Sequence, residues 1–174
     1  MKDSTGAQEP PAPRPPAAAV ARADYTGAVY GSLLAASVVV GTDPQEPFPR
    51  LQLVLLLLGT GVVFWAAHVF ARLFGERIVE GALTGRIVRQ DFVAEWPIVK
   101  AAVPPALAVA LSPLLGLGPE GTLWLALCVA IAGQVGWATL AALRAGVTGR
   151  LALMAGTANL LIGLLIVLLK VTLH

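Results

Sequence analysis

The chain has 174 residues, of which 57% are apolar and 13% are charged, and its formal net charge is +2. A soluble domain carries about 25% charged residues, so this composition excludes an ordinary soluble domain and favours burial in a membrane. The small net charge gives no support for nucleic-acid binding, and the single cysteine excludes an internal disulfide and a cysteine-rich metal site. Five long ranges contain no Lys, Arg, Asp or Glu: 25–42, 51–71, 101–119, 121–143 and 151–169.

These ranges predict an all-α membrane protein, a bundle of five transmembrane helices with an interfacial amphipathic segment between the second and the third. The predicted spans are about 25–41, 51–72, 98–117, 122–143 and 151–169. Residues 1–20 are rich in Pro and Ala and cannot bury enough apolar surface to offset the entropy of ordering. We therefore predict a disordered cytoplasmic tail, followed by one transmembrane domain over residues 21–174.

The first predicted span carries a stripe of small residues. Gly27, Gly31 and Ala35 recur every four residues and so share one helix face. Inside a membrane, small residues let two helix backbones approach closely and pack. We expect this stripe to be a packing face, either within the bundle or between two copies.

The second predicted span holds a histidine that lies between Trp65 and Arg72 on one helix face. His68 could be a hydrogen-bonded structural residue, which we favour, or it could relay a proton or an ion. A metal site needs several converging ligands, and no second ligand lies at a suitable spacing, so we expect no metal. Tyr30 and Ser32 fall at a comparable depth on the first span and are its expected partners.

The connection 73–100 holds most of the remaining charge and repeats apolar residues at roughly helical spacing. This pattern predicts amphipathic helices in the membrane interface, and a soluble helical cap is the alternative. Arg72, Glu76 and Arg77 could contact anionic lipid headgroups or a cytoplasmic partner, or could simply form a solvated charged face.

The third predicted span contains Pro104 and Pro105 near its middle. Proline lacks a backbone donor and clashes with the preceding turn, so we predict a kink or a break in this helix. A broken helix can build a transporter binding site, although a simple kink is the commoner outcome.

The fourth and fifth predicted spans each carry one amide side chain, Gln134 and Asn159. The two residues lie at similar distances from the short loop that joins the spans, so antiparallel helices place them at the same depth. We expect an interhelical hydrogen bond between them, because an unpaired amide in lipid is costly. The alternative is that both line a polar pathway.

The distribution of Lys and Arg predicts the orientation. These residues concentrate in the tail, in the connection 73–100 and in the loop before Leu151, and are sparse in the alternate connections. The positive-inside rule therefore predicts a cytoplasmic N-terminus and an extracytoplasmic C-terminus in the cell membrane. Abundant Ala, Leu, Val, Gly and Arg with little Lys and Ile is typical of proteins from high-GC bacteria.

No catalytic motif is visible: we find no phosphate-binding glycine loop, nucleophile elbow, HExxH or paired intramembrane acids. We predict no enzymatic activity and no cofactor, and rank a membrane enzyme with dispersed residues third. We favour an accessory or structural membrane component that contacts the lipid bilayer and either a second copy or another membrane protein. The alternative is a small oligomeric transporter or channel whose path is lined by His68, Gln134 and Asn159.

Overall fold

The computed structural model describes residues 17–43, 50–77, 85–146 and 148–173, with the side chains of 17–24, 76–77, 87 and 173 left out. Residues 1–16 of the predicted tail lie outside this part of the chain, and the first helix begins at Ala17. All regular structure in the described ranges is helical: α1 Ala17–Val40, α2 Arg50–Arg72, the π-helix η1 Leu73–Arg77, α3 Gly85–Ala94, α4 Pro97–Leu111, the 3-10 helix η2 Ser112–Leu115, α5 Pro119–Arg144 and α6 Gly149–Leu173.

Four helical segments in these ranges are long and apolar enough to cross a membrane: Arg50–Gly75, Val88–Leu115, Pro119–Arg144 and Gly149–Thr172. They overlap four of the five predicted spans. The first predicted span falls on α1, whose apolar part, Tyr25–Val40, is a shorter apolar helix than the other four. The described part of the chain is therefore all-helical, with four candidate membrane spans.

The third candidate span begins at Val88, earlier than the predicted start at Ile98. The reason is that α3 and α4 follow each other with only the turn Glu95–Trp96 between them. Part of the predicted interfacial segment thus belongs to the helical segment that leads into α4.

α4 remains α-helical through Pro104 and Pro105, so of the two predicted outcomes the break is not observed, and the kink stays a prediction. The fixed φ of proline, near −65°, is itself compatible with a helix, and Pro105 is buried against neighbouring helices that hold it in place. The helix instead ends at Leu111, passes into η2 and stops at Gly116, whose φ of 67° is in the left-handed region that favours glycine.

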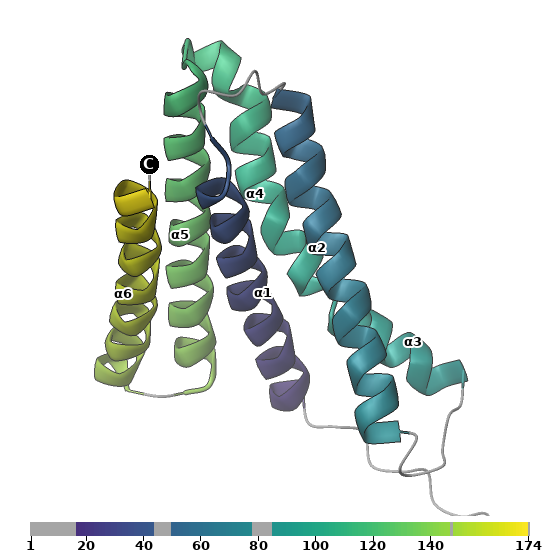
Figure 1. Ribbon diagram of the computed structural model, residues 1–174. Coiled ribbons are helices and arrows are strands. Elements are labelled where there is room, and N and C mark those ends of the chain that lie inside the picture. The colour runs from purple at the N-terminus through teal and green to yellow at the C-terminus, as the bar shows by residue number, and fades with distance from the viewer. Residues whose placement is uncertain (1–16, 44–49, 78–84, 147, 174) are drawn as a thin grey trace, which may run out of the picture.

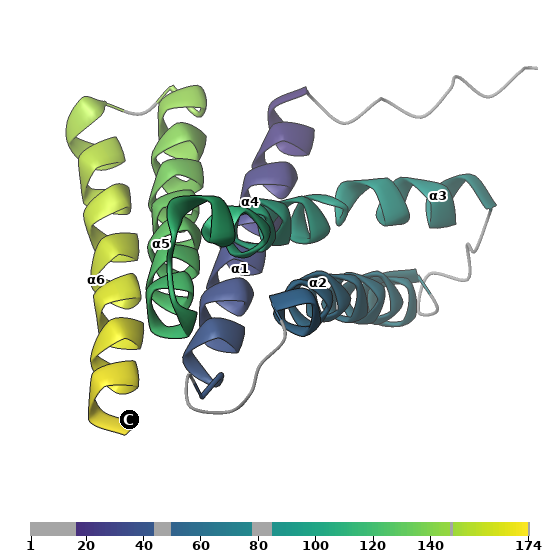
Figure 2. The ribbon, with the colours of Figure 1, turned by 90° about the horizontal axis from the view of Figure 1, so that it is seen from above.

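The helices run up and down in alternation, and α1, α4 and α5 form the centre of the bundle (Figures 1 and 2). Their contact is built largely from alanine, which allows close packing: the buried core is Ala35, Ala36, Val39, Leu53, Leu57, Ala106, Val109, Leu123, Ala126, Leu127 and Ala130. α2 packs against α4 on one side, and α6 packs against α5 on the other. The outward faces of α2 and α6 expose leucines such as Leu55 and Leu161, as lipid-facing helices do.

The predicted packing stripe of α1 lies against α4 and the core. A Cβ atom added to Gly31 would lie 2.5 Å from the carbonyl oxygen of Ile98, whereas one added to Gly27 would meet Pro97 and Ile98 at an ordinary 3.5 Å. Ala35 is 3% exposed. The backbones of α1 and α4 therefore touch at Gly31, where any side chain would overlap the α4 backbone.

The α5–α6 pair is also closely packed. A Cβ atom at Gly156 would lie 2.6 Å from Thr139 Oγ1, and one at Gly163 would lie 2.7 Å from Ile131 Cγ2. Both glycines of α6 thus face α5, with Asn159 between them along the helix. This packing fixes the rotation of α6 and turns Asn159 towards α5.

Candidate functional site

The two intramembrane amides meet at the α5–α6 contact. Gln134 Nε2 donates to Asn159 Oδ1 at 3.3 Å and lies 3.4 Å from the backbone carbonyl oxygen of Asn159. Asn159 Nδ2 donates in turn to the carbonyl of Ala155, one helical turn earlier, at 3.0 Å. The structure therefore brings together the amide pair that the sequence predicts.

One atom of this pair stays without a partner. Gln134 is 1% exposed, and its carbonyl oxygen Oε1 accepts no hydrogen bond from any residue in the described ranges. A buried acceptor that loses its bond to water in this way costs about 1–3 kcal/mol. The amide group of Gln134 therefore has a hydrogen-bond partner for its nitrogen Nε2 but no donor for its oxygen Oε1 within the described residues.

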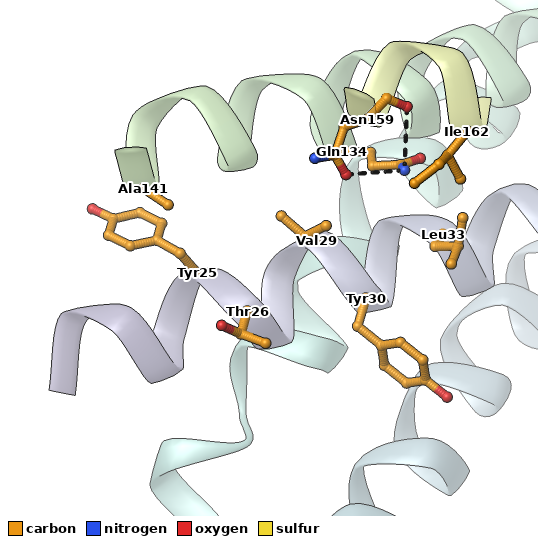
Figure 3. A pocket seen from close by; sticks show the side chains of 9 residues that line it. All are labelled: Tyr25, Thr26, Val29, Tyr30, Leu33, Gln134, Ala141, Asn159 and Ile162. Atoms are coloured by element: carbon orange, nitrogen blue, oxygen red, sulfur yellow. Dashed lines mark hydrogen bonds between the residues drawn. The ribbon is translucent and has the colours of Figure 1, made fainter. Parts of the chain in front are cut away.

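Gln134 and Asn159 line a groove of about 330 Å³ between α1, α5 and α6 (Figure 3). Its walls are largely apolar, and the residues that line it are Tyr25, Thr26, Val29, Tyr30, Leu33, Gln134, Ala141, Asn159 and Ile162. Ile162 is 45% exposed, so the groove opens along the outer side of α6. The groove is therefore shallow and largely apolar, and the amide groups of Gln134 and Asn159 lie on one side of it.

His68 lies on the other side of α1, on α2. Its ring centroid is 5.0 Å from that of Tyr30, and the two planes are tilted by 48°. Tyr30 also contacts Phe64 edge-on, with 6.3 Å between the ring centroids. In Figure 3 the Tyr30 ring points away from Gln134, so His68 and the amide pair occupy separate sites on opposite sides of α1.

Ser32, the other expected partner of His68, faces a different helix. Its hydroxyl donates to the carbonyl of Ala28 at 2.9 Å and is buried. A Cβ atom added to Gly133 of α5 would lie 3.3 Å from Ser32 Oγ. Of the two predicted partners, the structure brings Tyr30 to His68 and turns Ser32 towards α5.

The end of α2 is tied to the segment that follows it. Trp65 Nε1 donates to the carbonyl of Phe92 at 3.0 Å, and the Trp65 ring packs edge-on against the rings of Phe92 and Trp96. Arg72 Nη1 donates to Glu95 Oε1 at 2.7 Å. Arg72, predicted to reach headgroups or a partner, therefore forms an ion pair within the chain.

The side chains of Glu76 and Arg77, the other two predicted contacts, lie outside the described residues. The sequence analysis did not single out Phe92 or Glu95. The sequence feature that could have indicated these contacts is the position of Phe92 and Glu95. They lie late in the connection 73–100, which is long enough to fold back along α2.

A second cluster that the sequence analysis missed joins α1 to α5. The Arg144 guanidinium donates to the Tyr25 hydroxyl and lies 5.6 Å from the centre of its ring. The Tyr25 ring is 6.1 Å from that of Trp137. All three residues lie near the ends of predicted spans on the same predicted side of the membrane. That shared position is the sequence feature that could have indicated the contact. This cluster closes one end of the groove, where Tyr25 also forms part of the wall.

Metal-binding chemistry finds no support in this arrangement. Within the residues that the structure places, no group of three or more His, Cys, Asp or Glu side chains comes close enough to hold a metal ion. The Cys128 thiol is exposed on α5.

Comparison with protein-family models, curated proteins and solved structures gave no match.

Proposed function

We propose that this protein is an accessory or structural component of the cell membrane with five spans, a cytoplasmic N-terminus and an extracytoplasmic C-terminus. In this proposal α1 is the fifth crossing helix. Support comes from its position between the candidate spans α4 and α5, with α2 and α6 outside them (Figure 2). The ends of α2 and α5 that carry Arg72 and Arg144 lie at the same side of the bundle as the start of α1 (Figure 1). The positive-inside rule assigns that side to the cytoplasm.

The observation that carries the proposal is the way polar side chains of the helices are used. Gln134 is bonded to Asn159, and the Ser32 hydroxyl is bonded to its own helix. His68 packs against the Tyr30 ring rather than sharing a cavity with the amide pair. A conducting pathway needs a continuous polar lining, whereas the groove in this protein is mostly apolar. Polar groups that serve packing within one chain favour a structural role over transport.

The proposal assigns the partner contact to α3, at the cytoplasmic interface. α3 is fastened to α2 through Trp65 and Phe92, while Arg86, Arg89 and Val93 remain exposed, Val93 to 65%. Two arginines beside an exposed apolar residue suit a membrane-protein partner, or a second copy, with an acidic and apolar surface.

A photo-cross-linking experiment in native membranes tests this role. A photoreactive amino acid at Val93 should give a discrete adduct with a second protein or a second copy. The same amino acid at Leu161, on the lipid-facing side of α6, should label lipid only. Arg89→Glu should abolish the Val93 adduct. Equal protein labelling at both positions, or none at Val93, would remove α3 as the contact surface.

The second candidate is a small oligomeric transporter or channel, and the observation that favours it is that the intramembrane amides of Gln134 and Asn159 both line the groove. Proton, Na⁺ and K⁺ flux into liposomes containing the purified protein separates the two candidates. The accessory role predicts flux equal to that of empty liposomes. Flux above that level, lost in correctly folded His68→Ala or Gln134→Leu, would establish transport instead.

A further inference from the structure

The groove between α1, α5 and α6 runs from one end of these helices towards their middle, and the accessory role makes no use of it. Tyr25 and Ala141 lie at one end of the groove, and Leu33 and Ile162 at the other (Figure 3). From Tyr25 to Leu33 it extends about 12 Å along α1, at ~1.5 Å per residue. One leaflet contributes about half of a hydrocarbon layer that is ~30 Å thick, so the groove has about the depth of one leaflet.

The walls and the opening of the groove suit a hydrocarbon chain. Val29, Leu33 and Ile162 are apolar, and Ile162 is 45% exposed, so a chain can enter sideways beside α6. A volume of about 330 Å³ is at the lower end of the range for small-molecule sites, about 300–1,000 Å³. The space is too narrow for a further helix, which is about 10 Å across.

The Tyr25 end of the groove presents hydrogen-bond donors at the level of the membrane surface. Arg144 is the last residue of α5, and its guanidinium donates one N–H to the Tyr25 hydroxyl. The remaining N–H groups of Arg144 form no ion pair with a described carboxylate, and its side chain is exposed. The Tyr25 hydroxyl accepts in this contact and keeps its own proton to donate. Two donors therefore lie side by side where the groove begins.

The charge at this end favours an anion. Arg144 and Arg150 flank the loop between α5 and α6, both side chains are exposed, and the loop contains no acidic residue. The charged residues whose side chains are not described beside Tyr25 are Arg22 and Asp24, and their formal charges cancel. A phosphate is the anion that suits these donors, because a guanidinium can donate two parallel N–H bonds to its oxygens.

We propose that the groove binds one anionic phospholipid, whose phosphate accepts hydrogen bonds from Arg144 and Tyr25. One of its acyl chains lies along the groove against Val29, Leu33 and Ile162. A zwitterionic phospholipid has the same chains and phosphate, but its cationic group would lie beside the arginines and weaken its binding. A phosphate ion in solution lacks the chain that fills the groove.

The test uses two photoreactive phospholipids with equal chains, a phosphatidylglycerol and a phosphatidylcholine, each with a diazirine on one chain. The purified full-length protein is labelled in nanodiscs of phosphatidylcholine at the same low mole fraction of either probe, and labelled peptides are mapped by mass spectrometry. The phosphatidylglycerol probe should label the groove-lining residues of α1 and α6 about fivefold more, the effect of one interfacial arginine. Unlabelled phosphatidylglycerol should compete with it, and inorganic phosphate should not.

Three variants make the test specific. Arg144→Gln should bring the labelling by the two probes close to equal, and Arg86→Gln, the same substitution at an exposed position of α3, should keep the preference. Ile162→Trp fills the groove without changing the arginines and should reduce labelling of α1 and α6 by both probes, which also serves if Arg144→Gln does not fold.

Four outcomes would overturn the proposal. They are equal labelling by the two probes in the parent protein, labelling that maps outside the groove, a preference that persists in folded Arg144→Gln, and competition by inorganic phosphate. The last of these would indicate a site for a free anion instead of a lipid.

Discussion

The centre of the bundle and its flanks are held by different interactions. At the centre, α1 crosses α4 with backbones in contact at Gly31, and alanines fill the surrounding core. On the flanks, polar bonds join the helices: Arg72 with Glu95 beside α2, and Gln134 with Asn159 between α5 and α6. Hydrophobic association does not drive helices together within lipid, so both strategies rely on short-range contact.

The difference has a structural consequence. Backbones in contact leave no room for another molecule where α1 crosses α4. Between α5 and α6 the amide pair lies between two close glycine contacts, and the groove lies beside it, where α1 faces this pair of helices. The centre of this protein is thus specified by shape, whereas its α5–α6 flank combines close packing at Gly156 and Gly163 with hydrogen bonding.

The largest expected effect is at the centre. Gly31→Ala puts a methyl group 2.5 Å from the Ile98 carbonyl oxygen, so the helices must separate, which costs about 1–3 kcal/mol of stability. Gly59→Ala in α2 is the matched control, because nothing lies within 4 Å of its added Cβ. That variant should be neutral or stabilising by up to about 1 kcal/mol. Reversible unfolding in mixed detergent micelles measures both, and equal values would contradict close contact at Gly31.

The polar contact beside α2 should give the next largest effect. Glu95 is 11% exposed at its side chain and Arg72 33%. Glu95→Gln keeps an acceptor but removes the charge, and we expect a loss of about 1–2 kcal/mol in the same unfolding assay. Glu120→Gln, at an exposed position in the first turn of α5, should lose only a few tenths. An equal loss in both would show that the pair is exposed to water in the membrane-bound protein.

Replacing one amide of the Gln134–Asn159 pair should change the stability by a different amount from replacing the other. Asn159→Leu removes the Oδ1 acceptor of a buried amide and should cost about 1 kcal/mol. Gln134→Leu removes a bond of about 0.6 kcal/mol but also removes the partnerless Oε1, whose burial costs about 1–3 kcal/mol, so the variant should be as stable as the parent or up to about 2 kcal/mol more stable. A larger loss for Gln134→Leu than for Asn159→Leu would mean that Oε1 is bonded in the membrane.

The smallest effect is spectroscopic and concerns the contact between α1 and α2. Tyr30→Leu removes an aromatic ring 5.0 Å from the His68 ring and should shift the His68 proton resonances in an NMR spectrum. Ser32→Ala, two residues further along, should leave them in place, because Ser32 faces α5. Shifts of the same size in both variants would contradict the rotation of α1 described above.

Counting residues along the chain predicted which side chains lie at the same depth in the bundle. It did not predict how each helix is rotated about its axis, and so which neighbour a side chain faces. Depth brought Gln134 and Asn159 together, because a short loop joins their helices and fixes both distances. Depth also selected Tyr30 and Ser32 as partners of His68, but two residues of a helix differ by about 200° in direction, so only Tyr30 reaches α2. The rotation of a helix about its axis depends on how it packs against neighbouring helices. The position of a residue along one helix gives no information about that packing.

The sequence also did not predict the contacts that form where the chain turns back after α2. Trp65 and Arg72 were recognised as one helix face, but their partners Phe92 and Glu95 come from a segment whose path depends on tertiary packing. Local rules also did not separate a kink from a break at the prolines of α4. The helix continues through Pro104 and Pro105, of which only Pro105 is buried.

In the proposed five-span arrangement, the short apolar part of α1 bears on which helices match the thickness of the bilayer. At ~1.5 Å per residue, Tyr25–Val40 covers about 24 Å, less than a hydrocarbon layer of ~30 Å. α1 lies among α4, α5 and α2, whereas the longer α2 and α6 present their leucines to the lipid. In the proposed five-span arrangement, hydrophobic mismatch at α1 is therefore shielded by protein, and the perimeter helices set the membrane thickness that this bundle prefers.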